Sequence, residues 1–180
     1  MTNGSPLEYA LAGLLKQKPQ SGYDLRKIFA TTPMRHFSDS PGSIYPALRR
    51  LRSRKWVSAA AQDDNARKRQ VFRLTRAGDR ALIEWLRQPI TRSDVVWRMD
   101  ELLLRFAFLD GNVRRTQSQK FLLEFEREVE NYTHELREYF ANFGPGIRSS
   151  TGALAFSNGI EGYEAHLAWA RRARKKLSEA

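Results

Sequence analysis

Three sets of side chains in this sequence could do catalytic or metal chemistry. Asp63 and Asp64 are neighbours, and paired carboxylates can act as acid and base or hold a cation. The second group alternates along one segment, as Glu124, Glu126, Glu128 and Glu130. A step of two residues spreads these side chains around a helix, so we expect them on its solvent side. The third group is His36, His134 and His166, whose spacing is not that of metal ligands.

The chain also lacks the short motifs of common enzymes. It has no cysteine, which excludes disulfides and thiolate-bound metal. It contains no P-loop, no dinucleotide-binding glycine pattern and no G-x-S-x-G turn. We therefore expect no catalytic residue, no metal, no cofactor and no enzymatic activity.

Positive side chains indicate a different chemistry, which is binding to a polyanion. Five of them fall between Arg49 and Lys55, in the stretch SDSPGSIYPALRRLRSRKWVS. The formal net charge of the 180 residues is +11, and its distribution is uneven. Residues 1–94 hold 18 Lys and Arg against 8 Asp and Glu, whereas residues 95–180 hold 13 against 12. Such an asymmetry points to nucleic acid or to an anionic membrane surface.

Membrane insertion and secretion are not expected from this sequence. No apolar run approaches the roughly 18 residues that a membrane helix needs. The start, MTNGSPLEYALAGLLKQ, has no basic segment before its apolar stretch and so does not resemble a secretory signal. A cytoplasmic location is the expectation by elimination.

The N-terminal half predicts four helices and a β-hairpin. Leucines at positions 7, 11, 14 and 15 follow helical spacing, and Ser21 and Ser40 are typical helix N-caps. The expected elements are a helix ending at Lys18-Pro19, a helix over 22–30, a loop over 31–39, a helix from Pro41, strands in VSAAAQ and QVFRLT, and a helix over 76–88. Helix, helix, helix, hairpin, helix is the order of a winged helix-turn-helix.

The third helix of this arrangement would be the one that enters a DNA major groove. Ile44, Leu48 and Leu51 share its buried face, so Arg49 and Arg50 project from the other side. The predicted DNA contacts are Ser43, Tyr45, Pro46, Arg49, Arg50 and Ser53 on this helix, with Arg67, Lys68 and Arg69 at the hairpin tip.

Alternatives remain for several of these contacts. Arg49 and Arg50 could bind guanine edges, or they could only neutralise phosphates. The Tyr45 hydroxyl could donate to a phosphate, while its ring could pack on the second helix. The basic hairpin tip could also be a solvated turn.

The C-terminal half predicts an all-helical, antiparallel or coiled-coil dimerisation domain. Its apolar residues follow heptad steps of three and four. The predicted dimerisation residues are Leu122, Phe125, Val129, Tyr132, Leu136, Tyr139 and Phe143, followed by Phe156, Ile160, Tyr163 and Leu167. We therefore expect a winged-helix domain over 1–90, a linker over 91–97 and a helical domain over 98–180.

An aromatic-rich group follows the expected linker. Trp97, Met99, Leu103 and Phe106 lie there, and they could line a pocket for a small-molecule effector. A plain core between the two domains would explain the same residues.

The stretches SGYDLRKI, SPGSIYPALRRL and RKRQVFRLTRAGDRAL resemble the PadR family of transcriptional regulators, over residues 5–88. The tail over 98–177 is similar to the C-terminal dimerisation domain of the larger PadR subgroup. The resemblance implies a homodimer, usually a repressor, that binds palindromic operators in double-stranded DNA and is often released by a small molecule. The family commonly has Gly after the recognition helix, where this chain has Lys55, so we expect a slightly altered helix end.

These observations favour a homodimeric, sequence-specific regulator, most simply a repressor. A non-specific basic protein that binds DNA or RNA is the alternative, because charge alone permits it.

Overall fold

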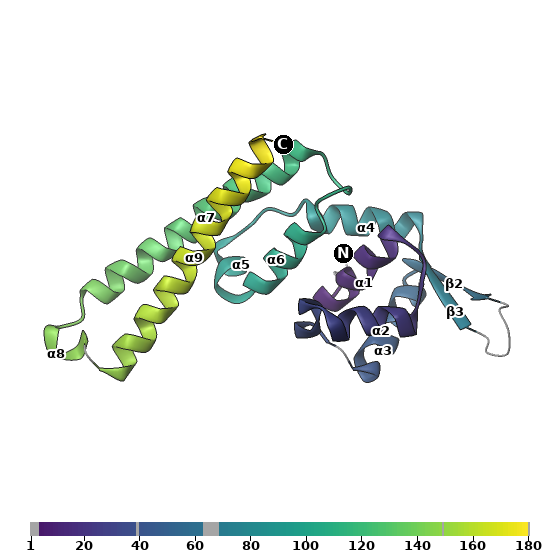
Figure 1. The fold of residues 1–180 in the computed structure, drawn as a ribbon, viewed down its shortest axis with the longest axis horizontal. Coiled ribbons are helices and arrows are strands. Elements are labelled where there is room, and N and C mark those ends of the chain that lie inside the picture. The colour runs from purple at the N-terminus through teal and green to yellow at the C-terminus, as the bar shows by residue number, and fades with distance from the viewer. Residues whose placement is uncertain (1–3, 39, 63–68, 149, 180) are drawn as a thin grey trace. The chain divides into compact units, whose positions relative to one another are not determined.

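The computed structural model describes residues 4–38, 40–62, 69–148 and 150–179, and the chain forms two compact units, Met1–Leu86 and Arg87–Ala180. The N-terminal unit contains α1 (Pro6–Gln17), β1 (Gln20–Ser21), α2 (Gly22–Thr31), the 3₁₀ helix η1 (Pro33–His36), α3 (Pro41–Ser53), β2 (Val57–Gln62), β3 (Arg69–Leu74) and α4 (Arg76–Leu86). The C-terminal unit contains α5 (Arg92–Trp97), α6 (Met99–Ala107), α7 (Arg115–Ala141), α8 (Pro145–Arg148) and α9 (Thr151–Glu179) (Figure 1). The predicted fold class, mainly helical with a small antiparallel sheet, is confirmed.

Side-chain caps fix where the N-terminal helices begin. The Ser21 hydroxyl accepts from the Asp24 N–H at 3.2 Å, and the Asp24 carboxylate accepts in return from the Ser21 N–H. The Ser40 hydroxyl accepts from the Gly42 N–H at 3.1 Å at the start of α3. Both predicted caps are confirmed, and each satisfies a backbone donor that the helix itself leaves unpaired.

The sheet has three antiparallel strands in the order β1-β3-β2. In the predicted hairpin, Val57 pairs with Leu74, and Gln62 pairs with Arg69 at the far end. The two-residue strand β1, which pairs with β3 at Phe72 and Val71, was not predicted, because two residues show no alternation. The helix η1 likewise lies within the expected loop over 31–39.

The N-terminal core lies between α1, α2, α3, α4 and the sheet. Its largest fully buried side chains are Leu11, Leu25, Phe29, Ile44, Leu48, Leu51, Leu82 and Trp85. The Tyr9 ring stacks on Trp85 with 4.4 Å between ring centroids. Gly78 lets α4 approach the sheet, because a Cβ there would lie 2.2 Å from the Trp56 carbonyl oxygen. These contacts hold α3 firmly against the rest of the unit.

In the C-terminal unit, the long helices α7 and α9 run antiparallel and pack on each other (Figure 1). Rings meet across this contact, with 5.7 Å between the centroids of Phe125 and Trp169 and 4.9 Å between those of Tyr132 and Tyr163. The two predicted heptad segments therefore pack on each other within one chain. Their role between two chains stays a prediction.

Ion pairs flank this helix pair. Glu126 accepts from Arg174 at 2.7 Å, and Glu130 accepts from Arg171 at 2.7 Å. The expectation that the alternating glutamates lie on the solvent side is wrong for Glu126, which is only 9 % exposed. A two-residue step alternates between opposite sides of a helix, so the four carboxylates do not share one solvent-facing side, and Glu126 lies beside Arg174 of α9.

The segment 91–97, expected to be a linker, forms α5. The Thr91 hydroxyl accepts from the Asp94 N–H, and the Asp94 carboxylate accepts from the Thr91 N–H at 2.8 Å, so α5 begins with a reciprocal cap. Val95 is fully buried, and α5 packs on α6 and α7. Within the described parts of the chain, no helix is both long and apolar enough to span a membrane.

Candidate nucleic-acid interface

Helix α3 has one buried and one charged side. Ile44 and Leu51 are completely buried and Leu48 is 1 % exposed, as their spacing predicts. Arg49, Arg50, Arg52 and Ser53 are exposed on the other side. Because its buried side chains anchor α3 to α1, α2 and β2, the helix offers its cationic side as a rigid surface.

The remaining predicted contacts on α3 differ in how free they are. Tyr45 is 40 % exposed, and its ring lies so close to the start of α2 that a Cβ on Gly22 would come within 2.6 Å of it. Ser43 and Pro46 are half-buried. The Ser53 hydroxyl donates to the Arg50 carbonyl at 2.8 Å, so its hydrogen is already used in a bond within α3.

The end of α3 is built on an unusual backbone. Lys55 has a φ of 60°, which is the left-handed conformation. The Trp56 N–H donates to the Leu51 carbonyl and the Lys55 N–H donates to the Arg52 carbonyl, both at 2.9 Å. This is the Schellman arrangement, which normally uses glycine at the left-handed position. The expected alteration of the helix end is therefore wrong: the chain keeps the usual ending and places a lysine in it.

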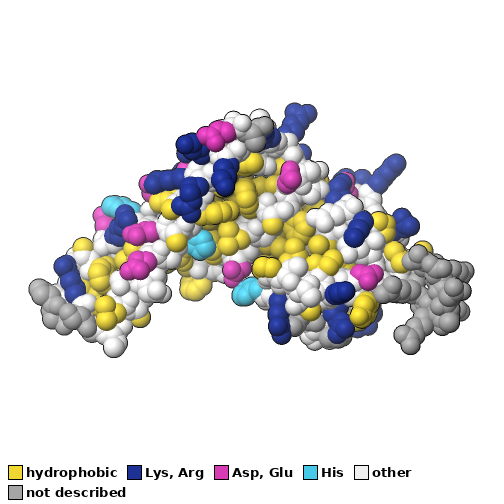
Figure 2. Space-filling model, viewed as in Figure 1, with side chains coloured by type: hydrophobic (Ala, Val, Ile, Leu, Met, Phe, Trp, Pro, Cys, Tyr) yellow, Lys and Arg dark blue, Asp and Glu magenta, His cyan; other side chains and the backbone are white. Residues whose placement is uncertain are grey.

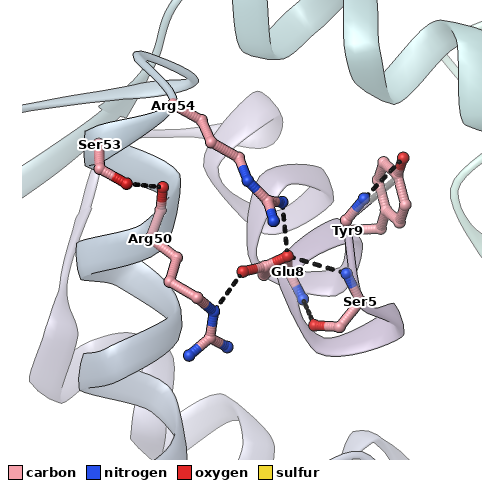
Figure 3. A network of polar contacts seen from close by, with 7 residues as sticks. Ser5, Glu8, Tyr9, Arg50, Ser53 and Arg54 are labelled. Carbon is pink, nitrogen blue, oxygen red and sulfur yellow. Dashed lines mark hydrogen bonds and ion pairs between the residues drawn. The ribbon is translucent and has the colours of Figure 1, made fainter. Parts of the chain in front are cut away.

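A buried carboxylate connects α1 to the cationic side of α3 (Figure 3). Glu8 is 1 % exposed, and its two oxygens accept from Arg50 Nε at 2.7 Å and Arg54 Nη1 at 2.9 Å. Burial alone would raise the pKa of Glu8, but bonds from the Ser5 N–H and both arginines lower the pKa below its ordinary value. Glu8 is therefore ionised at neutral pH.

Glu8 was not predicted from the sequence to be part of the site. The spacing of Ser5 and Glu8 is that of a capping box, and the structure shows both of its bonds, at 2.8 and 3.3 Å. That pattern could have predicted the cap. The arginine partners lie 42 and 46 residues away in the sequence, and no local pattern indicates them.

The predicted wing is described only in part. Arg67 and Lys68 lie outside the described residues, and for Arg69 only the backbone pairing with Gln62 is described. On the face in Figure 2, dark blue Lys and Arg side chains predominate over the N-terminal unit, while blue and magenta side chains mix along α7 and α9. This distribution agrees with the charge asymmetry of the sequence.

The four residues predicted to line an effector pocket differ in their exposure, and their role in binding an effector stays a prediction. The Trp97 side chain is 81 % exposed, and Met99 and Leu103 are half-buried. Phe106 does line a cavity of about 570 Å³ in the C-terminal unit, together with Ala107, Leu109, Asp110, Val113, Arg115, Ser118 and Leu177. Across the described residues, no cluster of three or more His, Asp or Glu could hold a metal ion.

Several solved structures are similar to this chain over most of its length. Bacillus subtilis PadR in complex with operator DNA has a TM-score of 0.44 and 20% identity, over 95% of this chain and 98% of that chain. The same protein with p-coumaric acid has a TM-score of 0.43 and 22% identity, over 97% and 99%. A PadR-like transcriptional regulator from Bacillus cereus has a TM-score of 0.42 and 24% identity, over 94% of each chain.

Comparison of sequences also finds a relative and a family model. The negative transcriptional regulator PadR of Bacillus subtilis (strain 168) is 28% identical over 118 residues. The match covers 64% of this chain and 63% of that protein, which is slightly less than two thirds of its length. Residues 11–84 match the model of the transcriptional regulator PadR-like family, and they span nearly the whole N-terminal unit. In that unit, the chain is similar to the PadR-like family of transcriptional regulators, as its motifs indicated.

Proposed function

We propose that this protein is a sequence-specific DNA-binding repressor that inserts α3 into the major groove of its operator. The observation that carries the proposal is the cationic side of α3, where Arg49, Arg50 and Arg52 are exposed opposite a fully buried apolar side. An α-helix fits the major groove, which is about 12 Å wide. The repressing activity is proposed from the Bacillus subtilis relative, which is named a negative transcriptional regulator.

The proposed DNA contacts differ in whether each side chain already has a partner within the protein. Arg49 is exposed and has no hydrogen bond or ion pair within the described parts of the chain, which suits a contact to phosphate or to a base edge. Tyr45 has its ring beside the start of α2 and is 40 % exposed, and its hydroxyl would donate to a phosphate. The hairpin tip with Arg67, Lys68 and Arg69 would supply further backbone contacts beside the groove.

A pair of variants tests the role of α3. Arg49→Ala removes an exposed charge from α3, and Arg80→Ala removes an exposed charge from α4 as a matched control. By fluorescence anisotropy on a DNA site selected by the wild-type protein, Arg49→Ala should weaken binding by about 1–3 kcal/mol. Arg80→Ala should bind within about twofold of wild type. Equal affinity of the Arg49 variant and wild type would contradict the role of α3.

We also propose that the protein acts as a homodimer, because a palindromic operator needs two copies of α3. The α7–α9 pair leaves large apolar side chains exposed, with Leu123, Tyr139 and Leu154 each more than half exposed. Exposed apolar surface of this kind commonly marks an interface. Light scattering should give about twice the chain mass of 20.8 kDa, and a monomer at micromolar concentration would refute the dimer.

A small-molecule effector is the last part of the proposal. The cavity beside Phe106, at about 570 Å³, lies within the usual size range of ligand pockets. Its lining is apolar apart from Asp110, Arg115 and Ser118. Ala107→Trp would fill part of it, and should abolish the effect of any compound that releases wild-type protein from DNA. Release of the variant at the same concentration would place the effector elsewhere.

A further inference from the structure

Three of the four arginines near the end of α3 are constrained to different degrees. Arg49 has no partner within the described residues. Arg50 donates through Nε alone, to Glu8 Oε1 at 2.7 Å, and its side chain stays 51 % exposed. Arg54 donates to Glu8 Oε2, lies over the Trp56 ring at 5.5 Å and is only 28 % exposed. The same helix end therefore carries a free, a tethered and an immobilised guanidinium.

The tether on Arg50 leaves its outer donors available. A guanidinium is planar, so a bond to Nε and the position of the side-chain stem together fix the orientation of the whole group. The two terminal nitrogens are then presented as a pair, and Figure 3 shows them turned away from Glu8. Neither has a protein partner among the described residues. A pair of donors with this spacing matches the O6 and N7 acceptors of guanine in the major groove.

The anchor of this tether is itself rigid. Glu8 accepts from the Ser5 N–H at 2.8 Å as part of the α1 cap, and its side chain is almost fully buried. Buried carboxylates with several charge-assisted bonds have little freedom to move. The position of the Arg50 guanidinium is therefore set by α1 as well as by α3.

We propose that Glu8 is a positioning residue for sequence recognition: it holds Arg50 in the orientation that binds a guanine edge, while the untethered Arg49 supplies affinity through phosphate. This inference rests on the proposed DNA-binding function. A pre-oriented guanidinium gives up less freedom on binding the correct base, so Glu8 should affect discrimination between sequences more than overall affinity.

Glu8→Gln is the central variant, because glutamine keeps the size of the side chain and removes its charge. The full-length wild-type protein first selects its site from random duplex DNA. Affinities are then measured for that site and for each single base-pair change in it. Glu8→Gln should lower the discrimination at one guanine by about tenfold and leave non-specific affinity equal or slightly higher, because Arg50 is then less neutralised.

Two further variants separate positioning from structure. Arg50→Lys should relax discrimination at the same base pair, and the double variant should be no worse than Arg50→Lys alone, because both changes remove one contact. Arg54→Lys disturbs the other oxygen of the same carboxylate and should leave discrimination within about twofold. A purely structural Glu8 would lower affinity for all sequences by one factor, or its effect would multiply with that of Arg50→Lys, and either result would overturn the proposal.

A measurement without mutation covers the case in which Glu8→Gln does not fold. In the NMR spectrum of the free wild-type protein, the Arg50 Nε–H should exchange slowly with water and be rigid, whereas the Arg49 Nε–H should exchange fast. Equal exchange rates of the Arg49 and Arg50 Nε–H groups would contradict a stable bond between Arg50 and Glu8. Failure of the wild-type protein to select any motif would instead contradict the proposed function, while a selected motif whose discrimination survives Glu8→Gln would contradict only the role of Glu8.

Discussion

At the scale of single residues, the end of α3 carries a conformational strain that the sequence hinted at. Lys55 adopts a φ of 60°, and a non-glycine residue there costs about 1–2 kcal/mol. The missing glycine was visible in the sequence, but its consequence was not predictable from it. In this ending the Lys55 and Trp56 N–H groups donate to two carbonyls of α3, and these bonds act against the strain.

Lys55→Gly should relieve this strain. We expect the free energy of unfolding to rise by about 0.5–1 kcal/mol, since the gain from removing Cβ is partly offset by the greater freedom of glycine in the unfolded chain. Chemical denaturation measures it. Lys55→Ala keeps the Cβ and should stay close to wild type. A Lys55→Gly protein less stable than wild type would contradict the strain.

The ionisation of Glu8 makes part of the stability depend on pH. Its pKa in the folded protein lies below its ordinary value, so the folded state favours the charged form. The stabilisation is fully present above the unfolded pKa of about 4.3 and is lost as pH falls through the lower folded value. Denaturation at a series of pH values should show Glu8→Gln about 1–3 kcal/mol less stable than wild type at pH 7. The difference should shrink below pH 4, and a constant difference down to pH 3 would contradict it.

At the scale of elements, the sequence predicted most of what positions the site. The apolar spacing of Ile44, Leu48 and Leu51 determined which side of α3 is buried, and the structure agrees. The heptad pattern around Val129 predicted burial correctly, and α9 packs on α7 within the same chain, while a contact with a second chain stays a prediction. A periodic apolar stripe shows that something covers a helix, and it does not show what does. Long-range ion pairs such as Glu8 with Arg50 have no local signature at all.

The hairpin between β2 and β3 carries a prediction of its own. Replacing Arg67, Lys68 and Arg69 with Ala should flatten the dependence of log K on log[salt] by about two to three units, because each phosphate contact releases nearly one counterion. Binding titrations between 50 and 200 mM salt measure this slope. A matched triple variant at Arg171, Arg172 and Lys176 of α9 should leave it unchanged. An unaltered slope in the hairpin variant would show that the hairpin tip does not contact DNA phosphates.

At the scale of the whole molecule, the protein joins a positively charged N-terminal unit to a helical C-terminal unit of nearly balanced charge. If two copies assemble, the operator must repeat the contacts of one α3 with two-fold symmetry. The spacing of the two half-sites then follows from DNA geometry, about 10 base pairs or a multiple of it from centre to centre. The two-fold symmetry of the operator follows from the dimer and not from the structure of either unit alone.

Selection of bound sequences from random duplex DNA by the full-length protein tests this account most directly. The account predicts enrichment of a two-fold symmetric motif with guanines at equivalent places in each half and centres separated by whole helical turns. The Arg50→Lys variant should enrich the guanine of each half-site far less. Recovery of DNA without any shared sequence, by a protein that still binds it tightly, would show that α3 contributes only charge and would contradict sequence-specific regulation.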